Sequence, residues 1–494
     1  MAIKFEPPVI GSEAARHHAQ AAAGNIQVTT AAIAELDGVL SGVRSSQRIL
    51  LKAAAGAGKS YALRRMVASA LQHDACGRVG VVAFKNKQII PLAEGIGRDL
   101  GREKVCLLVA NGRAVDVPES TKAAAVVVEA AADVPSSAQV IVATTHKVGG
   151  FGTGHLRKAI GNAAGGDYLF DVLFVDEAWE LALHLYRKVK NLAPVCVGVG
   201  DVGQLPPIDS GQNPWRGDRR YNPYRAWPTK FEDDPQTWSR ELPAVWRPTA
   251  AQLPLWRSFY GDWDSLDCVA SPGDRSITVN GLRGPAAEVW RQVATGVPTL
   301  VEVDGLEEPE AADVDMPLLL VVEMWLDRLL GAGFTLDSMH YDDAGLPVRP
   351  VQVRSDKPTG DHLITVLATR NQAVDDAMDM VDRLTAKHRL PDGVITASTV
   401  DSWQGRTNGI TVALHPLSGA SALDEFNSAF GRLAVTCTRA THGLLMVSRA
   451  GLTDLLANAP ARPGTPLGEP GTRQLPRQTH QRILQTFARG TYTV

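Results

Sequence analysis

Residues 48 to 60, RILLKAAAGAGKS, constrain the fold of this chain more than any other stretch. The apolar residues 49 to 51 predict a buried strand, and residues 61 to 72, YALRRMVASALQ, have helical periodicity. Strand, glycine-rich turn and helix in this order form a phosphate-binding loop of the pattern GxxxxGK[ST]. The sequence therefore predicts an α/β domain that binds a nucleotide polyphosphate, with Ala53 at the first glycine position.

Each residue of this loop has an expected task. Gly56 and Gly58 let backbone N–H groups close around phosphate, Lys59 reaches the β- and γ-phosphates, and the Ser60 hydroxyl binds Mg²⁺. The positive end of the following helix dipole favours the same anion. The expected cofactors are ATP and Mg²⁺, and the expected nucleotide-binding residues here are Ala55, Gly56, Ala57, Gly58, Lys59 and Ser60.

Composition limits what surrounds the loop. A chain of 494 residues with 45% hydrophobic content can build several cores. Its formal net charge of −3 gives no overall positive charge that would attract nucleic acid, so a nucleic-acid partner would need a local groove. The five cysteines form no CxxC pair, which argues against a zinc site or a disulfide framework and favours a cytoplasmic location. No stretch is apolar enough to predict a membrane span.

Polar side chains follow two further predicted strands, residues 79 to 83 and 140 to 143. Phe84, Lys85 and Asn86 follow the first strand, and Thr145 and His146 follow the second. Open α/β sheets bind ligands at the carboxyl ends of their strands, so these residues are candidates for nucleic-acid contact by stacking and by phosphate binding. The alternative for Phe84 is a place in the core.

Two carboxylates end the predicted strand at residues 172 to 175. We expect Asp176 to hold Mg²⁺ and Glu177 to polarise the attacking water. Gln204 follows a further predicted strand, in the stretch APVCVGVGDVGQLPPI, and is expected to sense the γ-phosphate. The alternative for either acid alone is the start of a helix, where negative charge complements the dipole.

The ordered set of motifs resembles the superfamily 1 helicases, in particular the RecD-like and nonsense-decay-helicase-like branch, superfamily 1B. The matching stretches are AAAGAGKS, AFKNK, DEAW, GDVGQLPP, VWRPTAAQLPLWRSFYGD, ITVLATRNQAVDDAMDMV, ASTVDSWQGRTNGI and GRLAVTCTRATHGLLMV, which together extend from residue 53 to residue 447. The resemblance implies that Arg247 and Arg439 act on the γ-phosphate, Arg439 as an arginine finger. It also implies that Gln404 and Gly405 bind the nucleotide and that Trp403 contacts nucleic acid.

Strands and helices alternate again in the second half, which predicts a second doubly wound sheet without a phosphate loop of its own. The expected fold class is α/β, with two RecA-like doubly wound parallel-sheet motor domains and the ATP site in the cleft between them. The expected divisions are a loose N-terminal segment 1–28, a first RecA-like domain 29–213, a basic aromatic segment 214–245, a second RecA-like domain 246–455, and a Pro/Gly-rich linker with a C-terminal helix 456–494.

The stretch from residue 215 to 230 interleaves five cations with four aromatic residues. Such a pattern suits contact with a single strand, with Arg219 and Arg220 on the phosphates. An equal alternative is a linker whose aromatic residues pack on the lobes.

The expected function is that of an ATP-dependent helicase or translocase on single-stranded nucleic acid, with DNA favoured over RNA. Replication, recombination or repair proteins are candidate partners, and the sequence does not indicate an oligomeric state. Asn371 and Thr399 are only 28 positions apart (399 − 371), too few for the extra domain of the 3′-to-5′ members, which favours 5′-to-3′ movement. Two alternatives remain, an ATPase that remodels protein–nucleic acid complexes without unwinding and a nucleotide-gated binding protein.

Overall fold

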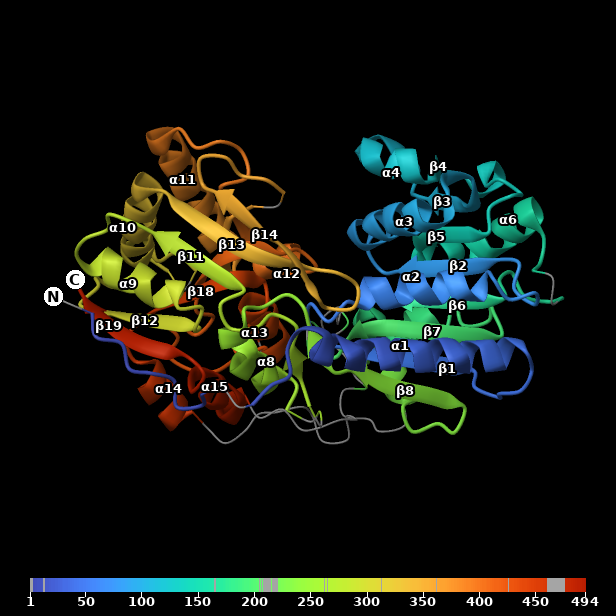
Figure 1. Cartoon of the computed structure of the whole chain (residues 1–494), viewed down its shortest axis with the longest axis horizontal. Coiled ribbons are helices and arrows are strands. Elements are labelled where there is room, and N and C mark those ends of the chain that lie inside the picture. Colours follow the sequence, from blue (N-terminus) through green and yellow to red (C-terminus); the bar gives the residue numbers. More distant parts are fainter. Residues whose placement is uncertain are drawn as a thin grey trace.

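Two lobes, each built around a parallel sheet, lie side by side in the computed structural model (Figure 1). The structure describes residues 3–11, 14–163, 166–203, 205, 207, 215, 221–261, 263, 265–311, 313–360, 362–424, 426–459 and 476–494. Both chain ends lie at the second lobe (Figure 1).

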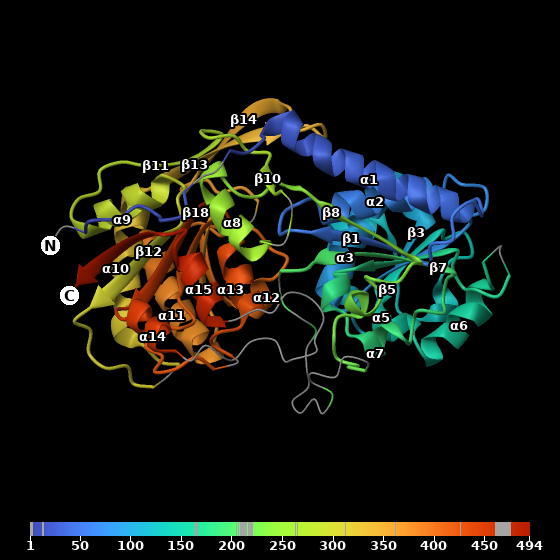
Figure 2. The same ribbon diagram turned by 90° about the horizontal axis from the view of Figure 1, so that it is seen from below.

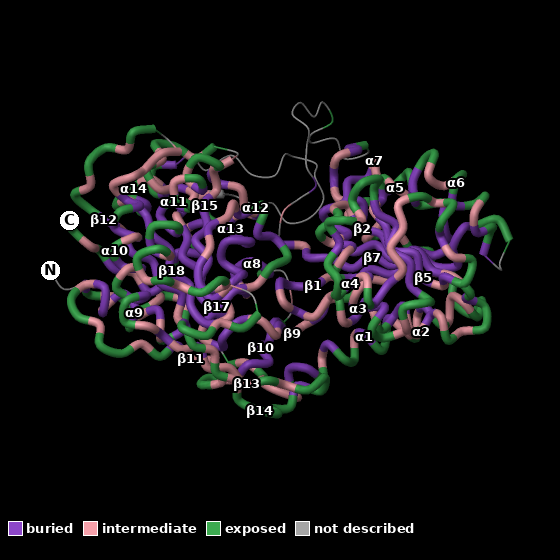
Figure 3. Tube along the Cα trace, turned by 90° about the horizontal axis from the view of Figure 1, so that it is seen from above, coloured by how far each residue is buried: buried purple, intermediate pink, exposed green. Residues whose placement is uncertain are grey.

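The first lobe contains an eight-stranded sheet in which all neighbouring strands are parallel. Its strands, in spatial order, are β4 (Val126–Val128), β3 (Val105–Leu108), β5 (Val140–Thr144), β2 (Val79–Ala83), β6 (Val172–Asp176), β7 (Val195–Asp201), β1 (Arg48–Ala53) and β8 (Thr237–Leu242). The helices of this lobe are α1 (His18–Leu40), α2 (Lys59–Ala70), α3 (Asn86–Leu100), α4 (Glu119–Ala124), α5 (Thr145–Val148), α6 (Phe151–Ile160) and α7 (Leu183–Tyr186). Near-continuous apolar strands of this kind are typical of a sheet that is covered on both faces, and Figure 3 shows the central strands as buried.

The second lobe contains a six-stranded parallel sheet and a smaller antiparallel one. The large sheet has the order β16 (Ile395–Thr399), β15 (Ile364–Ala368), β17 (Asn408–Leu414), β18 (Ala440–Arg449), β12 (Thr299–Asp304) and β19 (Ala488–Thr493). The helices are α9 (Pro285–Ala294), α10 (Met316–Ala332), α11 (Asn371–His388), α12 (Val400–Trp403), α13 (Phe430–Cys437), α14 (Leu452–Asn458) and α15 (Pro476–Leu484). The antiparallel sheet consists of β11 (Arg275–Val279), β13 (Phe334–Tyr341) and β14 (Pro347–Arg354). The expected α/β fold with two doubly wound parallel sheets is confirmed.

A single apolar cluster joins the lobes. It contains Leu63 of α2, Trp256 of α8 (Leu253–Phe259), Leu433 of α13 and Ile483 of α15, all buried. The Phe259 ring lies 5.4 Å from that of Phe430, between centroids. Because α8 packs on both lobes, we expect movement of one lobe to act on the other through this helix.

Several boundaries differ from those expected. The N-terminal helix begins at His18, so the expectation of a loose segment over residues 1–28 is wrong from residue 18 onward, and Figure 2 shows this helix lying along α2. Tertiary contacts hold this helix in place. His18 bonds to the side chain of Asp274, and the Asn25 amide donates to the carbonyls of Ala57 and Ala244, contacts that a local sequence pattern cannot predict.

Two further strands were not anticipated. β8 falls inside the expected segment 214–245 but forms the edge of the first sheet beside β1. β19, at the C-terminus, forms the edge of the second sheet beside β12. The C-terminal residues therefore form the expected helix and also complete the second core. The domain boundaries remain predictions. Among the described residues, no helix is both long and apolar enough to cross a membrane.

Candidate active site

The order of the strands brings three motifs together at the carboxyl ends of the strands in the first sheet. β6, β7 and β1 are neighbours, and their carboxyl ends carry Asp176, Asp201 and the phosphate loop. The second lobe faces this edge with residues that precede its strands, since Gly405 and Thr407 come just before β17, and Arg439 just before β18. Groups from both lobes therefore meet in one place.

A cavity of about 410 Å³ lies where these edges meet, within the usual size range of ligand pockets. Its walls comprise Ala55, Gly56, Gly58, Lys59, Ser60, Tyr61, Glu177, Trp246, Arg247, Gly405, Thr407, Arg439 and Thr441. Nine of the predicted catalytic and nucleotide-binding residues thus line one cavity. They are five residues of the phosphate loop, Glu177, the two arginines and Gly405.

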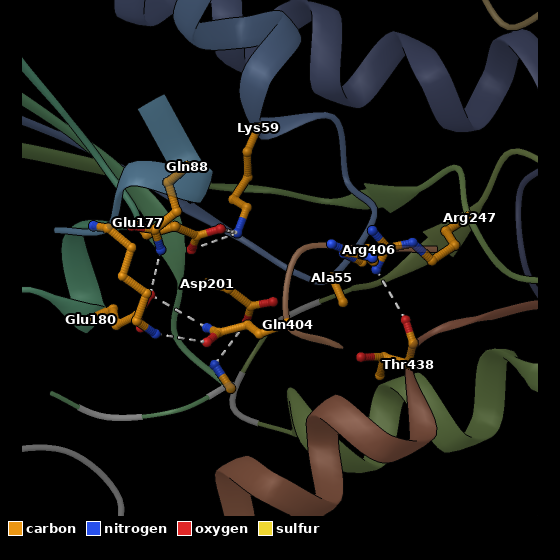
Figure 4. Close-up of polar contacts among 12 residues, drawn as sticks. Ala55, Lys59, Gln88, Glu177, Glu180, Asp201, Arg247, Gln404, Arg406 and Thr438 are labelled. Atoms are coloured by element: carbon orange, nitrogen blue, oxygen red, sulfur yellow. Dashed lines mark hydrogen bonds and ion pairs between the residues drawn. The ribbon is translucent and has the colours of Figure 1, made fainter. Parts of the chain in front are cut away.

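Lys59 and Glu177 form an ion pair on the wall of this cavity (Figure 4). The Lys59 ammonium lies 2.7 and 2.8 Å from the two Glu177 carboxylate oxygens, and both side chains are about one-seventh exposed (14% and 15%). Burial alone lowers the pKa of Lys59, but Glu177, Asp201 and Asp176 outweigh it and raise the pKa above its usual value. Lys59 is therefore charged at neutral pH and available to an anion that can compete with Glu177.

Asp176 and Ser60 fit the task of holding Mg²⁺. Asp176 is buried, and its Oδ1 has no hydrogen-bond partner, as expected of an oxygen that serves a cation. Burial first, and Glu177 second, raise the pKa of Asp176, so a divalent cation would favour its ionised form. In the described part of the chain no three His, Cys, Asp or Glu side chains group as a metal site, so the ion would depend on phosphate and water oxygens as well.

The two arginines reach the cavity from different segments: Arg439 comes just before β18 of the second lobe, and Arg247 follows β9 (Ala244–Val245) and lies beside Gly56 of the loop. Arg247 donates from Nη1 to the Thr438 carbonyl at 3.0 Å, and burial, then the neighbouring Arg439, lower the pKa of Arg247 to about 9 (Figure 4). Arg439 is 1% exposed and donates to the Val435 carbonyl at 3.1 Å and to Thr438 Oγ1 at 3.1 Å. Neither guanidinium has a salt bridge among the described residues, which leaves a buried cation, Arg439, and a half-buried one, Arg247, on the cavity wall.

Residues far away in sequence fix the backbone of the loop. Tyr260 donates its hydroxyl to Asp201 Oδ1 at 2.8 Å and accepts the Ala55 N–H at 3.0 Å. Trp256 donates its indole N–H to the Ala55 carbonyl at 3.1 Å. The backbone N–H of Trp246 bonds to the Gly56 carbonyl at 2.8 Å. The loop is thus held by the segment that contains α8, and only its remaining groups face the cavity.

Gln404 lies outside the cavity wall, although it was expected to bind nucleotide. Its amide contacts Lys85 and Glu180 of the first lobe, at 3.5 Å in each case (Figure 4). Ala57 is buried behind the loop, where its carbonyl accepts from Asn25 at 2.8 Å. The nucleotide-binding roles of these two residues remain predictions.

The nucleic-acid candidates lie together at the carboxyl ends of β2 and β5. The rings of Phe84 and His146 are 5.5 Å apart between centroids, Asn86 begins α3, and Thr145 is buried with an unpartnered hydroxyl. Lys85 forms an ion pair with Glu180. Their contact with nucleic acid stays a prediction.

Trp403 is separate from this group and only 3% exposed, and its indole N–H donates to Asn408 Oδ1 at 3.0 Å. In this conformation its ring is therefore not available for stacking on a base. Gln204, Arg219 and Arg220 fall outside the described residues. Trp227, within the basic aromatic stretch, is buried and stacks on Tyr186 at 4.0 Å, as the packed-linker alternative expects for that residue.

Sequence reasoning missed Tyr61, Trp246, Tyr260 and Glu180. Tyr61 and Trp246 adjoin Ser60 and Arg247, so an aromatic residue next to a motif was an available signal. Glu180 directly follows the DEAW stretch, but its contact with Gln404 lies 224 positions away in sequence, and the contact of Tyr260 with Ala55 lies 205 positions away, so the sequence did not indicate either role.

Comparison with known proteins gives distant structural likenesses only. No protein-family model and no curated protein sequence matches the chain. Similar solved structures include a PRRSV helicase (13% identity, TM-score 0.37, 84% of this chain and 56% of that one). They also include the arterivirus nonstructural protein 10 helicase with DNA (13%, 0.40, 83% and 63%) and the same protein crystallised alone (14%, 0.40, 83% and 62%). The chain thus spans 56–63% of the length of these helicases.

The close approach of Arg247 to the loop gives a test at Gly56. We expect Gly56→Ala to lower both nucleotide affinity and the free energy of unfolding more than Gly405→Ala does. Both glycines have positive φ (72° and 84°), which costs an L-residue roughly 1–2 kcal/mol, but only at Gly56 would a new Cβ overlap the Cβ of Arg247. Thermal unfolding and titration with a fluorescent ATP analogue measure the difference, and equal effects would contradict the contact.

Proposed function

We propose that this chain is an ATP-dependent helicase or translocase that acts on single-stranded nucleic acid, with DNA as the favoured substrate. The observation that carries the proposal is the cavity in which Lys59, Ser60 and Glu177 of one lobe face Arg247 and Arg439. A protein that only bound a nucleotide would not need a carboxylate and two arginines around the γ-phosphate position.

In the proposed reaction, the polyphosphate of ATP takes the place of Glu177 at Lys59. Backbone N–H groups of the loop and the dipole of α2 hold the β-phosphate. The Glu177 carboxylate, once released, can orient and deprotonate the attacking water. Ser60 and Asp176 would hold Mg²⁺, which supplies neutralisation of phosphate charge when bound.

Arg439 of the second lobe and Arg247, which lies beside the loop, would complete the site. A guanidinium is permanently charged and planar, so it suits the charge that develops on the γ-phosphoryl oxygens. In this conformation backbone carbonyls hold both side chains, so we propose that cleft closure redirects them onto the nucleotide. Alternating closure and reopening would then change the grip of each lobe on the strand.

Single-stranded nucleic acid would bind at the carboxyl ends of β2 and β5. Phe84 and His146 offer rings for stacking, and Lys85 and Asn86 offer donors to phosphate. Lys87 crosses from this edge to the second lobe, with Nζ 3.3 and 3.2 Å from the carbonyls of Asp401 and Ser402. A strand here would therefore contact both lobes.

A measurement of ATP hydrolysis with and without oligo-dT or oligo-rU tests the proposal. We expect single strands to raise the rate, with oligo-dT the more effective, because strand and nucleotide bind to the same pair of lobes. Lys59→Ala should abolish turnover, since the other charged groups of the cavity wall are Glu177 and the two arginines. Turnover by Lys59→Ala equal to that of wild type, or no response to either strand, would refute the proposal.

Arg439→Ala should lower the hydrolysis rate by about 10³ or more while ATP affinity stays within a few-fold, the scale of an arginine finger. Arg383→Ala serves as the control, because Arg383 forms an exposed pair with Glu323 in the same lobe. Rates are measured at saturating ATP. A decrease smaller than tenfold would show that Arg439 does not reach the γ-phosphate.

We also propose 5′-to-3′ movement. Residues 371–399, all described, hold α11 and β16 and no inserted domain. Unwinding of duplexes that carry a single tail measures the direction. We expect activity with a 5′ tail, and ATP-dependent unwinding confined to 3′-tailed duplexes would refute the direction while leaving the motor proposal in place.

A further inference from the structure

One short turn of the first lobe holds both of the lysines at the proposed ligand sites. Glu177 and the 3-10 turn η4 (Ala178–Glu180) follow β6 directly. Glu177 binds Lys59 at the nucleotide site, while Glu180 binds Lys85 at the proposed strand site. The two glutamates are three positions apart, so this turn touches both ligand sites at once (Figure 4).

The Glu180 carboxylate is buried among polar partners from both lobes. Its side chain is 3% exposed and accepts from Lys85, from Gln88 Nε2 at 2.6 Å and from Gln404 Nε2 at 3.5 Å. An exposed ion pair is screened and weak, but removal of one partner from a buried pair leaves an uncompensated charge. A strand phosphate that draws Lys85 away must therefore disturb Glu180.

The backbone of the turn can transmit that disturbance to Glu177. The Glu180 N–H bonds to the Glu177 carbonyl at 2.9 Å, which ties the two residues directly. Glu177 has φ = 49° and ψ = 48°, a left-handed conformation that costs a non-glycine residue free energy and persists only when its surroundings enforce it. Ala178 and Trp179 are buried against β7, where a Cβ on Gly200 would lie 2.8 Å from atoms of both. Glu177 and the turn are therefore packed and hydrogen-bonded as one unit.

We propose that Glu180 is a positioning residue that couples strand binding at Lys85 to the nucleotide site at Lys59. When strand phosphate takes Lys85, Glu180 loses its cation, the turn shifts, and Glu177 loosens its hold on Lys59. ATP then competes for Lys59 more easily, and the Glu177 carboxylate is free to act on water. This coupling rests on the proposed function, because it requires a nucleotide at one lysine and a strand at the other.

A purely structural role for the Glu180–Lys85 pair makes a different prediction. A structural pair, when broken, lowers stability and leaves the ratio of strand-stimulated to basal hydrolysis as it was. A coupling pair, when broken, changes that ratio. Glu180→Gln and Lys85→Gln each break the pair from one side and together distinguish the two roles. The first should raise strand affinity and the second should lower it.

The experiment measures ATP hydrolysis with and without oligo-dT, and oligo-dT affinity over a range of salt concentrations. Relative to wild type, we expect Glu180→Gln to raise basal hydrolysis and to lower the stimulation ratio by about fivefold or more, the lower end of typical coupling between sites. It should also bind oligo-dT more tightly, because Lys85 is released. Lys85→Gln should lower the ratio as well but bind more weakly, with a salt slope smaller by about 0.7 for one lost phosphate contact.

Glu323→Gln is the control and should keep the wild-type ratio, because it breaks only the exposed pair between Glu323 of α10 and Arg383 of α11. If wild type is stimulated by the strand and Glu180→Gln shows the same stimulation ratio, the coupling is overturned and the proposed function stays in place. If Glu180→Gln does not fold, an unchanged ratio in Lys85→Gln would overturn it in the same way. If the wild-type protein shows no stimulation by strand, the proposed function itself is refuted, and the coupling with it.

Discussion

The ion pair between Lys59 and Glu177 sets the electrostatics of the cleft. The strand order β6, β7, β1 places three buried or half-buried carboxylates, Asp176, Glu177 and Asp201, around one lysine. One cation cannot balance three acids in a buried place, so the free energy of this edge depends on further positive charge. Mg²⁺ at Asp176 would add positive charge, while the polyphosphate would take the place of Glu177 as the anion at Lys59. Arg439 of the second lobe and Arg247, which lies beside Gly56, supply positive charge on the same cavity wall.

The connection between the second lobe and the phosphate loop depends on α8 and its flanking residues. Trp246, Trp256 and Tyr260 fix the loop backbone, while Phe259 packs against Phe430 at the start of α13. α13 ends just before Arg439. A shift of the second lobe therefore reaches the phosphate loop through packed side chains and hydrogen bonds, which are stiff because protein interiors are close-packed.

Much of this architecture was predictable from the sequence, because the motifs follow buried strands whose apolar runs are unambiguous. β2 has the predicted bounds, and the residues around the cavity follow from the loop, the DEAW stretch and the two arginines. Edge strands β8 and β19 were missed, since polar, half-exposed segments such as TWSREL lack an apolar run. The start of α1 at His18, the surroundings of Gln404 and the burial of Trp403 depend on tertiary contacts, which single-sequence patterns do not contain.

The central claim is that a nucleotide held by Lys59 draws the two lobes into a different arrangement. Spin labels on Val43→Cys and Leu320→Cys would report it, because these positions are 79% and 56% exposed, one in each lobe, and the five native cysteines are all buried. The distance between the labels is measured by pulsed electron paramagnetic resonance, with and without a non-hydrolysable ATP analogue and Mg²⁺. The account predicts a shifted distance distribution in the otherwise native chain and no shift when Lys59→Ala is added. An unchanged distribution at saturating nucleotide would contradict it.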